Sequence, residues 1–126
     1  MVDRHVQSRL RKEQVIWLAT AGRDLKPQAV PVWFYWDGRS FLIFAQPGRK
    51  VSDIRENPNV ELHLNSDEAG DDVVRVSGQA AIATKVRPSP GYNRKYRSAI
   101  KNLGLTEESF FSDYNHPIRV TRLRYH

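Results

Sequence analysis

Residues 28–50, QAVPVWFYWDGRSFLIFAQPGRK, decide the fold of this chain. The segment Gln28 to Trp36 is rich in β-branched and aromatic residues, which favour a strand over a helix. Asp37-Gly38 then predicts a tight turn into a second strand over residues 40–45. The hairpin ends at Gly48-Arg49-Lys50, where a turn leads into a short helix that begins with a basic pair.

Pro31 lies inside the first of these strands and has no N–H to donate to a neighbouring strand. We therefore expect the strand over residues 28–36 to lie at an edge of the sheet, or to be bulged at Pro31. Its aromatic run, Trp33 to Trp36, alternates between two faces. Such a run is typical of a core strand, and a strand that faces a dimer partner or a flat ring ligand would show it too.

The rest of the chain extends this β pattern. Hydrophobic alternation bounded by turn residues predicts six strands in all, over residues 15–20, 28–36, 40–45, 59–65, 73–83 and 118–125. Helices are predicted over residues 3–13, 49–56 and 90–103, with Asp3 and Ser89 as N-caps, and a short one from Thr106. Gly78 indicates a bulge or bend in its strand. Because strand follows strand over residues 15–45, we expect an antiparallel barrel with peripheral helices rather than a parallel sheet.

The length of 126 residues predicts a single domain over residues 1–126. The sequence contains no cysteine, which excludes disulfides, zinc–thiolate sites, iron–sulfur clusters and thiol nucleophiles. No apolar run approaches the roughly 20 residues that cross a bilayer, and residues 1–13 are charged where a secretory signal would be apolar. These features predict a soluble cytoplasmic protein with no membrane partner.

Positive charge is concentrated in the last third of the chain. Lysine and arginine number 20 against 14 aspartate and glutamate residues, a net charge of +6. Residues 85–126 hold nine basic and three acidic residues, so this segment carries the whole excess. The excess indicates an anionic partner, such as nucleic acid, a membrane surface or a small phosphorylated or carboxylated molecule, or else only a solvated surface.

Gly48-Arg49-Lys50 is the strongest candidate for an anion site. The N-terminus of the helix over residues 49–56 offers unpaired N–H groups, and Gly48 lets the backbone approach a ligand closely. Two cations at this end oppose the helix dipole, which is reasonable if an anion lies between them. The alternative is a solvated basic turn.

No other motif indicates chemistry. The four histidines lack metal-ligand spacing, so we expect no metal site; they are His5, His63, His116 and His126. The acidic loop over residues 66–72 lacks calcium-loop spacing, and no nucleophile elbow or phosphate-binding glycine loop is present. The sequence therefore identifies no catalytic residue.

The order of these motifs resembles the pyridoxamine 5'-phosphate oxidase-like split-barrel flavoproteins. The likeness runs from Ser8 to Ala83 and rests on Pro-Val-Trp-Phe, the Asp-Gly hairpin, Pro-Gly-Arg-Lys and Asn57-Pro58. The flavin/deazaflavin oxidoreductases of the B type, which use the deazaflavin coenzyme F-420, look most similar. Lys95-Tyr96-Arg97 and residues 117–120 resemble one subgroup of F-420-dependent enzymes. The resemblance implies a homodimer of mainly β, six-stranded antiparallel split β-barrels with peripheral helices, and cofactor sites between the subunits.

The resemblance also implies which residues bind the cofactor. Lys50, seven positions before Asn57-Pro58, and Arg49 would hold its phosphate with help from backbone N–H groups near Val51. Two strand segments would flank the ring: Gln28, Val30, Pro31, Val32 and Trp33 from one, and Ala45 and Gln46 from the other. Gly48 stands where the pyridoxamine phosphate oxidases proper have a serine. Those enzymes are also longer, with further substrate residues, so oxidation of vitamin B6 is not implied.

The implied function is hydride transfer from reduced F-420, or from FMN, to a small organic acceptor. F-420 is favoured by the subgroup likeness and because residues 85–126 would complement its polyglutamate tail if they lined the cleft. Trp33, Trp36 and Phe110 are expected to shape the pocket. Tyr92 and Tyr96 are candidates to donate the proton, and nothing in the sequence selects between them and solvent.

Two other functions remain open at this point. Some split-barrel relatives bind a flavin, a deazaflavin or haem without established turnover, and this chain could do the same. A nucleic-acid binder would use the basic side of the helix over residues 90–103, which carries Arg94, Lys95, Arg97 and Lys101. The sequence contains no recognition-helix motif or RNA-binding signature, which makes nucleic acid the weakest of these readings.

Overall fold

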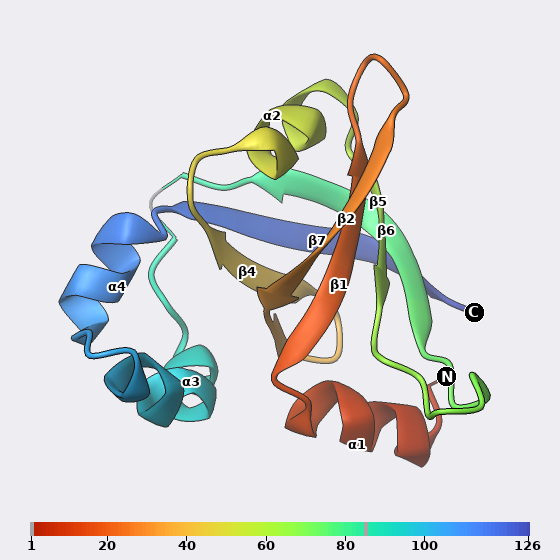
Figure 1. The fold of residues 1–126 in the computed structure, drawn as a ribbon, viewed down its shortest axis with the longest axis horizontal. Coiled ribbons are helices and arrows are strands. Elements are labelled where there is room, and N and C mark those ends of the chain that lie inside the picture. The colour runs from red at the N-terminus through yellow and green to blue at the C-terminus, as the bar shows by residue number, and fades with distance from the viewer. Residues whose placement is uncertain (1, 85) are drawn as a thin grey trace.

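A computed structural model describes residues 2–84 and 86–126, and this part of the chain forms seven strands and four helices (Figure 1). The strands are β1 (Val15–Ala21), β2 (Pro27–Trp33), β3 (Tyr35–Trp36), β4 (Phe41–Ala45), β5 (Asn59–His63), β6 (Arg75–Ile82) and β7 (His116–Tyr125). The helices are α1 (Arg4–Lys12), α2 (Arg49–Glu56), α3 (Pro90–Asn102) and α4 (Glu107–Asp113). All strand pairs are antiparallel, in the order β2-β1-β5-β6-β7-β4-β3, and the curled sheet leaves β2 and β3 as its two edges. The fold is a split barrel.

The expected count of six strands was wrong because the strand predicted over residues 28–36 is divided at Phe34. β2 pairs with β1 along its whole length, whereas β3 pairs with β4. Between them, the Phe34 N–H donates to the Tyr96 hydroxyl at 2.8 Å, and that hydroxyl lies 2.7 Å from the Phe34 carbonyl oxygen. A side chain from α3 therefore replaces the ladder hydrogen bonds at this residue and lets the chain cross from one edge of the sheet to the other.

The structure confirms the expectations for Pro31 and Gly78. β2 is an edge strand, where a proline without an N–H is tolerated. The register of β6 against β7 shifts between Ser77 and Gln79, as expected for a bulge. A Cβ atom on Gly78 would lie 2.8 Å from the Thr121 carbonyl oxygen, so only glycine lets β7 approach this closely.

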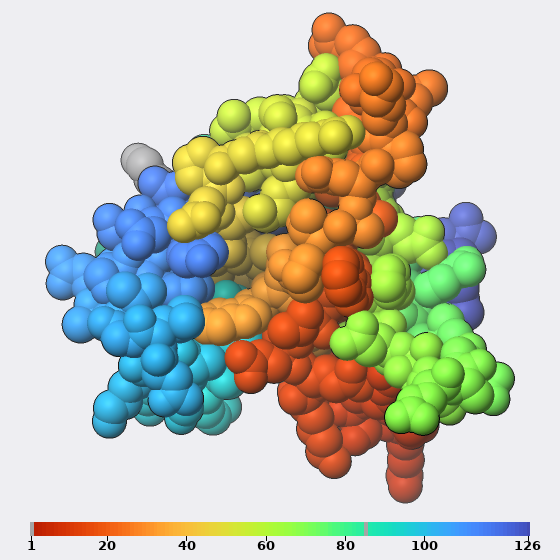
Figure 2. Space-filling model, viewed as in Figure 1, coloured from red at the N-terminus to blue at the C-terminus, as the bar shows by residue number. Residues whose placement is uncertain are grey.

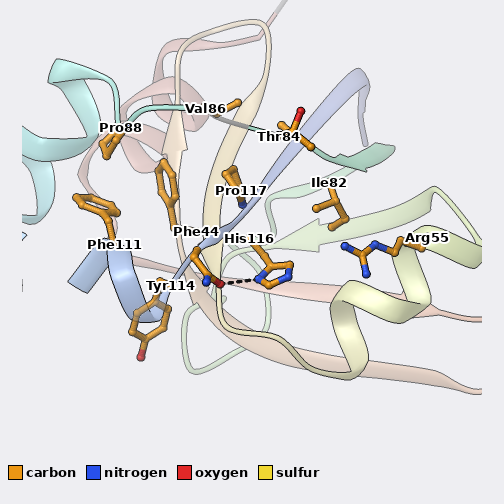
Figure 3. A pocket seen from close by; sticks show the side chains of 12 residues that line it. Phe44, Arg55, Ile82, Thr84, Val86, Pro88, Phe111, Tyr114, His116 and Pro117 are labelled. Atoms are coloured by element: carbon orange, nitrogen blue, oxygen red, sulfur yellow. Dashed lines mark hydrogen bonds between the residues drawn. The ribbon is translucent and has the colours of Figure 1, made fainter. Parts of the chain in front are cut away.

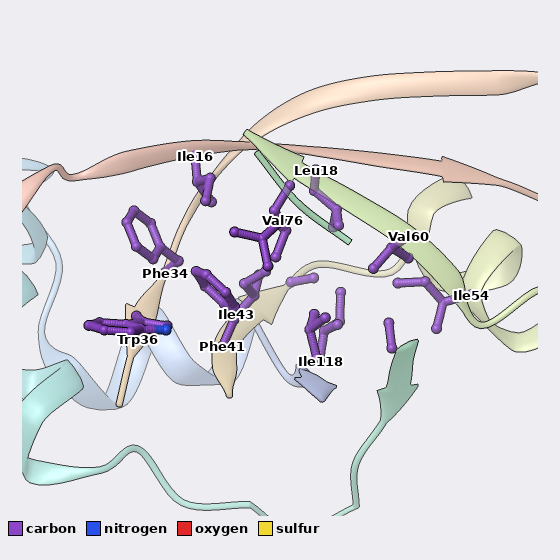
Figure 4. Packing of buried hydrophobic residues seen from close by; sticks show 14 of the residues in the cluster. Ile16, Leu18, Phe34, Trp36, Phe41, Ile43, Ile54, Val60, Val76 and Ile118 are labelled. Carbon is purple, nitrogen blue, oxygen red and sulfur yellow. The ribbon is translucent and has the colours of Figure 1, made fainter. Parts of the chain in front are cut away.

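The curled sheet encloses an aliphatic core (Figure 4). Ile16, Leu18, Ile43, Val76 and Ile118 each have no exposed surface. Burying a side chain of this size stabilises the fold by about 1.5–3 kcal/mol. This core accounts for the alternating pattern along β1, β5, β6 and β7.

A second, largely aromatic cluster lies outside the barrel, between β4 and the helices α3 and α4. Its buried members are Leu42, Phe44, Tyr92, Tyr96, Ile100 and Phe110. β4 contributes to both clusters, because Phe41 and Ile43 face the barrel whereas Leu42 and Phe44 face the helices. The uninterrupted apolar run of this strand follows from burial on both sides.

The helices begin where capping residues predict. The Asp3 carboxylate accepts a hydrogen bond from the Val6 N–H at 2.9 Å, and the Ser89 hydroxyl accepts one from the Tyr92 N–H at 3.1 Å. Thr106 and Ser109 form a reciprocal capping box at the start of α4. Within residues 2–84 and 86–126, no helix has the length and apolar character needed to span a bilayer.

Candidate functional site

A pocket of about 280 Å³ opens where the barrel is split, between the end of β2 and the end of β4. Figure 2 shows it as a hollow between α4 and β2, below the start of α2. We call it the β2–β4 pocket, and its lining residues are Pro31, Val32, Trp33, Phe44, Ala45, Gln46, Lys50, Leu103, Phe110 and Tyr114. The two strand ends supply one side, the first turn of α2 supplies a cation, and the α3–α4 region supplies an apolar side.

Six of the ten residues predicted to bind a cofactor meet in this pocket. They are Pro31, Val32, Trp33, Ala45, Gln46 and Lys50. Gln28 and Val30 lie further along β2, opposite Thr20 and Leu18 of β1, and do not line it. Arg49 and Val51 flank Lys50 on α2 and do not line it either. Cofactor binding by any of these residues stays a prediction.

Arg49 and Lys50 are adjacent in the sequence but have different surroundings. The Arg49 guanidinium donates to the Lys26 carbonyl oxygen at 2.8 Å and lies 3.5 Å from a carboxylate oxygen of Asp53. Asp53 is buried and also accepts a hydrogen bond from the Thr20 hydroxyl at 2.9 Å. Arg49 therefore fastens α2 to the β1–β2 hairpin. Lys50, about 100° further round the helix, lines the pocket and forms no ion pair with any described residue.

The backbone at the start of α2 is also partly occupied. The N–H groups of Val51 and Ser52 each lie 3.2 Å from the Gly48 carbonyl oxygen, to which they donate. The Val51 side chain is buried in the barrel core. The Val51 amide, predicted to help hold a phosphate, is thus already bonded within its own turn, and the Lys50 side chain is the cation that this turn presents to the pocket.

Stacked aromatic rings form the apolar side of the pocket. The Trp33 ring stacks on the ring of Tyr96, with centroids 4.8 Å apart and planes 9° from parallel, and on the ring of Phe110, at 5.4 Å and 16°. Phe110 stacks in turn on Tyr114 at 4.4 Å. Each ring in such a stack fixes the next, so Trp33 is a rigid part of the apolar side of the pocket.

Comparison with known proteins identifies the family. The family model described as pyridoxamine 5'-phosphate oxidase matches residues 2–125. The chain belongs to this family. No curated protein matches the sequence.

Solved structures share the split-barrel fold at low sequence identity. An F420 reductase is 21% identical with a TM-score of 0.66, over 99% of this chain and 96% of that chain. An FAD-binding protein from Mesorhizobium loti is 17% identical with a TM-score of 0.63, over 99% and 92%. The haem storage protein HutZ from Vibrio cholerae is 16% identical with a TM-score of 0.58, over 96% and 90%. At these identities the likeness shows the fold alone.

In this family member the expected roles of the aromatic residues hold only in part. Trp33 and Phe110 line the β2–β4 pocket as expected. Trp36 does not, because it is 5% exposed in the barrel core and donates its indole N–H to the Tyr125 hydroxyl at 3.0 Å. Phe44, Leu103 and Tyr114 line the pocket without having been predicted. The alternation along residues 41–45 could have indicated Phe44, whereas no local pattern indicates the other two.

Tyr92 and Tyr96 do not fit the role of proton donor. Both side chains are fully buried, and neither lines the pocket. Burial raises the pKa of each hydroxyl well above the ordinary value of a tyrosine. The Tyr96 hydroxyl instead hydrogen-bonds the backbone of Phe34, between β2 and β3. The same hydroxyl lies 2.6 Å from the Gln14 carbonyl oxygen.

No described basic residue of the C-terminal segment lines the β2–β4 pocket. Leu103, Phe110 and Tyr114, its described lining residues from this segment, are all uncharged. Lys95 was expected on the solvent side of α3, but its ammonium donates to the Phe34 carbonyl oxygen at 3.0 Å and lies 3.7 Å from the centroid of the Phe34 ring. Arg97 pairs with Glu107 at 3.7 Å. The continuous basic surface expected for nucleic acid is therefore interrupted.

A larger hollow of about 370 Å³ lies on the other side of Phe44 and Tyr114 (Figure 3). Arg55 and His116 lie at its polar side, and the His116 ring bonds the Asn115 side chain at 2.7 Å. None of the predicted cofactor residues lines it. We therefore take the smaller β2–β4 pocket, which contains Lys50 and the stacked rings, as the candidate site.

Proposed function

We propose that this chain is an oxidoreductase that uses a flavin or deazaflavin to transfer hydride to a small organic acceptor. F-420 is the favoured cofactor, and FMN is the alternative. The observation that carries the proposal is the meeting of Lys50 and the stacked Trp33 ring in one pocket at the split of the barrel. A phosphate-bearing tricyclic ring needs these two features together, a cation for the phosphate and an apolar wall for the ring.

The residues present fit such a cofactor. Lys50, unpaired within the described chain, would bind the phosphate through charge-assisted hydrogen bonds. Ala45 and Gln46 would border the ring from β4, and Pro31 to Trp33 from β2. Trp33, held rigid by Tyr96 and Phe110, would exclude water from one side of the ring. The bound cofactor would supply the hydride, and the protein would supply position and a dry environment.

We propose that a second copy of the chain completes the site. At about 280 Å³, the pocket is at the lower end of the range that encloses small-molecule ligands. It also lies beside β2, whose outer edge pairs with no described strand. A homodimer with a site between subunits would enlarge the pocket and cover this edge.

The preference for F-420 rests on the subgroup resemblance in the C-terminal segment. The split-barrel fold shared with an F420 reductase agrees with it but does not separate F-420 from FMN. The positive charge of residues 85–126 does not support F-420, because no described basic residue of that segment lines the pocket.

A cofactor carrier without turnover is the second candidate. The likeness to a haem storage protein shows that this fold serves other uses. However, the described lining of the β2–β4 pocket contains no histidine, and histidine is a common axial ligand of haem iron. The pocket therefore suits a stacked flavin or deazaflavin ring better than haem.

A binding titration followed by a turnover assay tests the proposal. The purified chain is titrated with F-420, FMN and haem, and the reduced form of the cofactor that binds is then mixed with simple enones as acceptors. We expect saturable binding of F-420 or FMN and faster cofactor oxidation with protein than without it. Binding without faster oxidation would support the carrier, and failure of both F-420 and FMN to bind would contradict the proposal.

A further inference from the structure

A third pocket, of about 300 Å³, lies between α1 and the first turns of α3. Both helices contact β3 and lie toward the same end of the barrel (Figure 1). Leu10, Tyr35, Trp36 and Gly91 form the uncharged part of its lining. We call it the α1–α3 pocket. None of its described lining residues belongs to the β2–β4 pocket.

Three cationic side chains line the α1–α3 pocket: Arg11 from α1, and Arg94 and Lys95 from α3. No carboxylate is among its described lining residues, and none of the three cations forms an ion pair within the part of the chain that the structure describes. Like charges gathered in a partly enclosed space repel one another more than they would in open solvent. A bound anion would remove this repulsion.

Lys95 is the most constrained of the three cations. Its ammonium is half-buried against the Phe34 ring and gives one hydrogen bond, to the Phe34 carbonyl oxygen at 3.0 Å. Burial lowers the pKa of Lys95 to about 8, and the charge of Glu13 opposes this shift only weakly. Glu13 itself is paired with Arg9. An ammonium with three donors therefore has one identified acceptor and no close counter-ion.

The backbone adds to the positive character of this pocket. Gly91 lies in the first turn of α3, where the helix dipole is positive. A Cβ atom on Gly91 would collide with the Tyr35 ring, so glycine lets this ring lie directly against the helix. Arg11 lies across from it, with its guanidinium 5.3 Å from the centroid of the Trp36 ring. The pocket thus combines cations with aromatic side chains.

We propose that the α1–α3 pocket binds the phosphate group of a small phosphorylated organic molecule, at a site separate from the cofactor. Two guanidinium groups can each offer paired N–H donors to phosphate oxygens, and Lys95 adds a third charge. A doubly charged phosphate ester matches three cations better than a single carboxylate does. The aromatic residues would contact the organic part of the molecule.

Calorimetric titration with phenyl phosphate, inorganic phosphate and pyrophosphate tests this site. The titrations use the full chain carrying Lys50→Ala, so that the other candidate phosphate site does not contribute. We expect saturable binding, with phenyl phosphate binding more tightly than inorganic phosphate because of Tyr35 and Trp36. Lys95→Gln should weaken binding by about tenfold or more, and Arg94→Gln by several-fold.

Matched variants on the same helix serve as controls. Lys101→Gln and Arg97→Gln remove the same charges from exposed positions outside the pocket, and we expect each to change the affinity by less than about twofold. Arg94 is exposed, so Arg94→Gln keeps the test valid if Lys95→Gln fails to fold. Absence of saturable binding, or equal losses in the pocket and control variants, would overturn the proposal. Neither result would bear on cofactor binding at Lys50.

Discussion

The β2–β4 pocket and the α1–α3 pocket are lined by opposite ends of one short segment, Trp33 to Tyr35, and they differ in charge. Trp33 lines the β2–β4 pocket, which holds one cation and a stack of aromatic rings. Tyr35 lines the α1–α3 pocket, which holds three cations. Phe34, where the chain leaves β2 and enters β3, separates them. Two residues along the chain are enough to pass from a pocket with one cation to a pocket with three.

The same contrast appears on α3, where Lys95 and Tyr96 are neighbours in the sequence. Tyr96 stacks on Trp33 behind the β2–β4 pocket, whereas Lys95 lines the α1–α3 pocket. The basic C-terminal segment thus contributes apolar side chains to one pocket and cations to the other. The position of a charge in the sequence did not predict which pocket it would line.

Removing the residue between the pockets should have the largest effect. Phe34 is fully buried, and its ring packs against the core on one side and Lys95 on the other. We expect Phe34→Ala to lower the free energy of unfolding by about 3–5 kcal/mol. Urea denaturation followed by circular dichroism measures this change. Leu25→Ala, at a residue that is 74% exposed, is the control. A similar loss of stability in both variants would contradict the stabilising role given to the buried Phe34 ring.

Removing the Tyr96 hydroxyl, which bonds the backbone of Phe34 between β2 and β3, should have a smaller effect. Tyr96→Phe keeps the stack on Trp33 but leaves the Phe34 N–H and the Gln14 carbonyl without the partner they have now. We expect the free energy of unfolding to fall by about 1–3 kcal/mol. The same denaturation experiment on Tyr114→Phe is the control, since that hydroxyl makes no hydrogen bond within the described chain. Equal stability of the two variants would contradict the role given to Tyr96.

The smallest expected effect is the one that Lys95, in the α1–α3 pocket, has on how the free energy of unfolding depends on pH. The pKa of Lys95 is about 8 in the folded chain and near 10.4 when unfolded, so between these values the unfolded chain binds more protons. The free energy of unfolding of the wild type should therefore rise with pH relative to that of Lys95→Met. The expected rise is about 1 kcal/mol after allowance for the partial exposure of Lys95. Denaturation of both proteins at pH 7 and pH 10 measures the difference. A difference that stays constant, or that falls as pH rises, would contradict this view of Lys95.

Local signals in the sequence were sufficient for most of the fold. Four predicted features depend only on neighbours in the chain or on a missing N–H group. They are the edge position of Pro31, the bulge at Gly78 and the N-caps Asp3 and Ser89. The break at Phe34 was not predicted, because it depends on Tyr96, which is 62 positions away. The β-branched and aromatic composition of residues 28–36 by itself predicts one strand.

The candidate site was predicted to a similar extent. The basic turn indicated Lys50, and the family resemblance implied the two strand ends, which belong to the same contiguous stretch of sequence. Arg49 and Lys50 differ because Arg49 contacts Asp53 and the Lys26 carbonyl at the tip of the hairpin. These contacts could not be predicted from the sequence, so both cations were expected to hold the phosphate. Leu103 and Tyr114 reach the pocket only because α3 and α4 pack against β4.

A cofactor titration of two lysine variants tests the central claim most directly. The dissociation constant of F-420, and of FMN, is measured for the wild type, Lys50→Ala and Lys95→Met, with circular dichroism to confirm folding. If the β2–β4 pocket holds the cofactor phosphate, Lys50→Ala weakens binding by about tenfold or more, while Lys95→Met changes it by less than about twofold. An unchanged constant for Lys50→Ala, or a larger loss for Lys95→Met, would contradict the account.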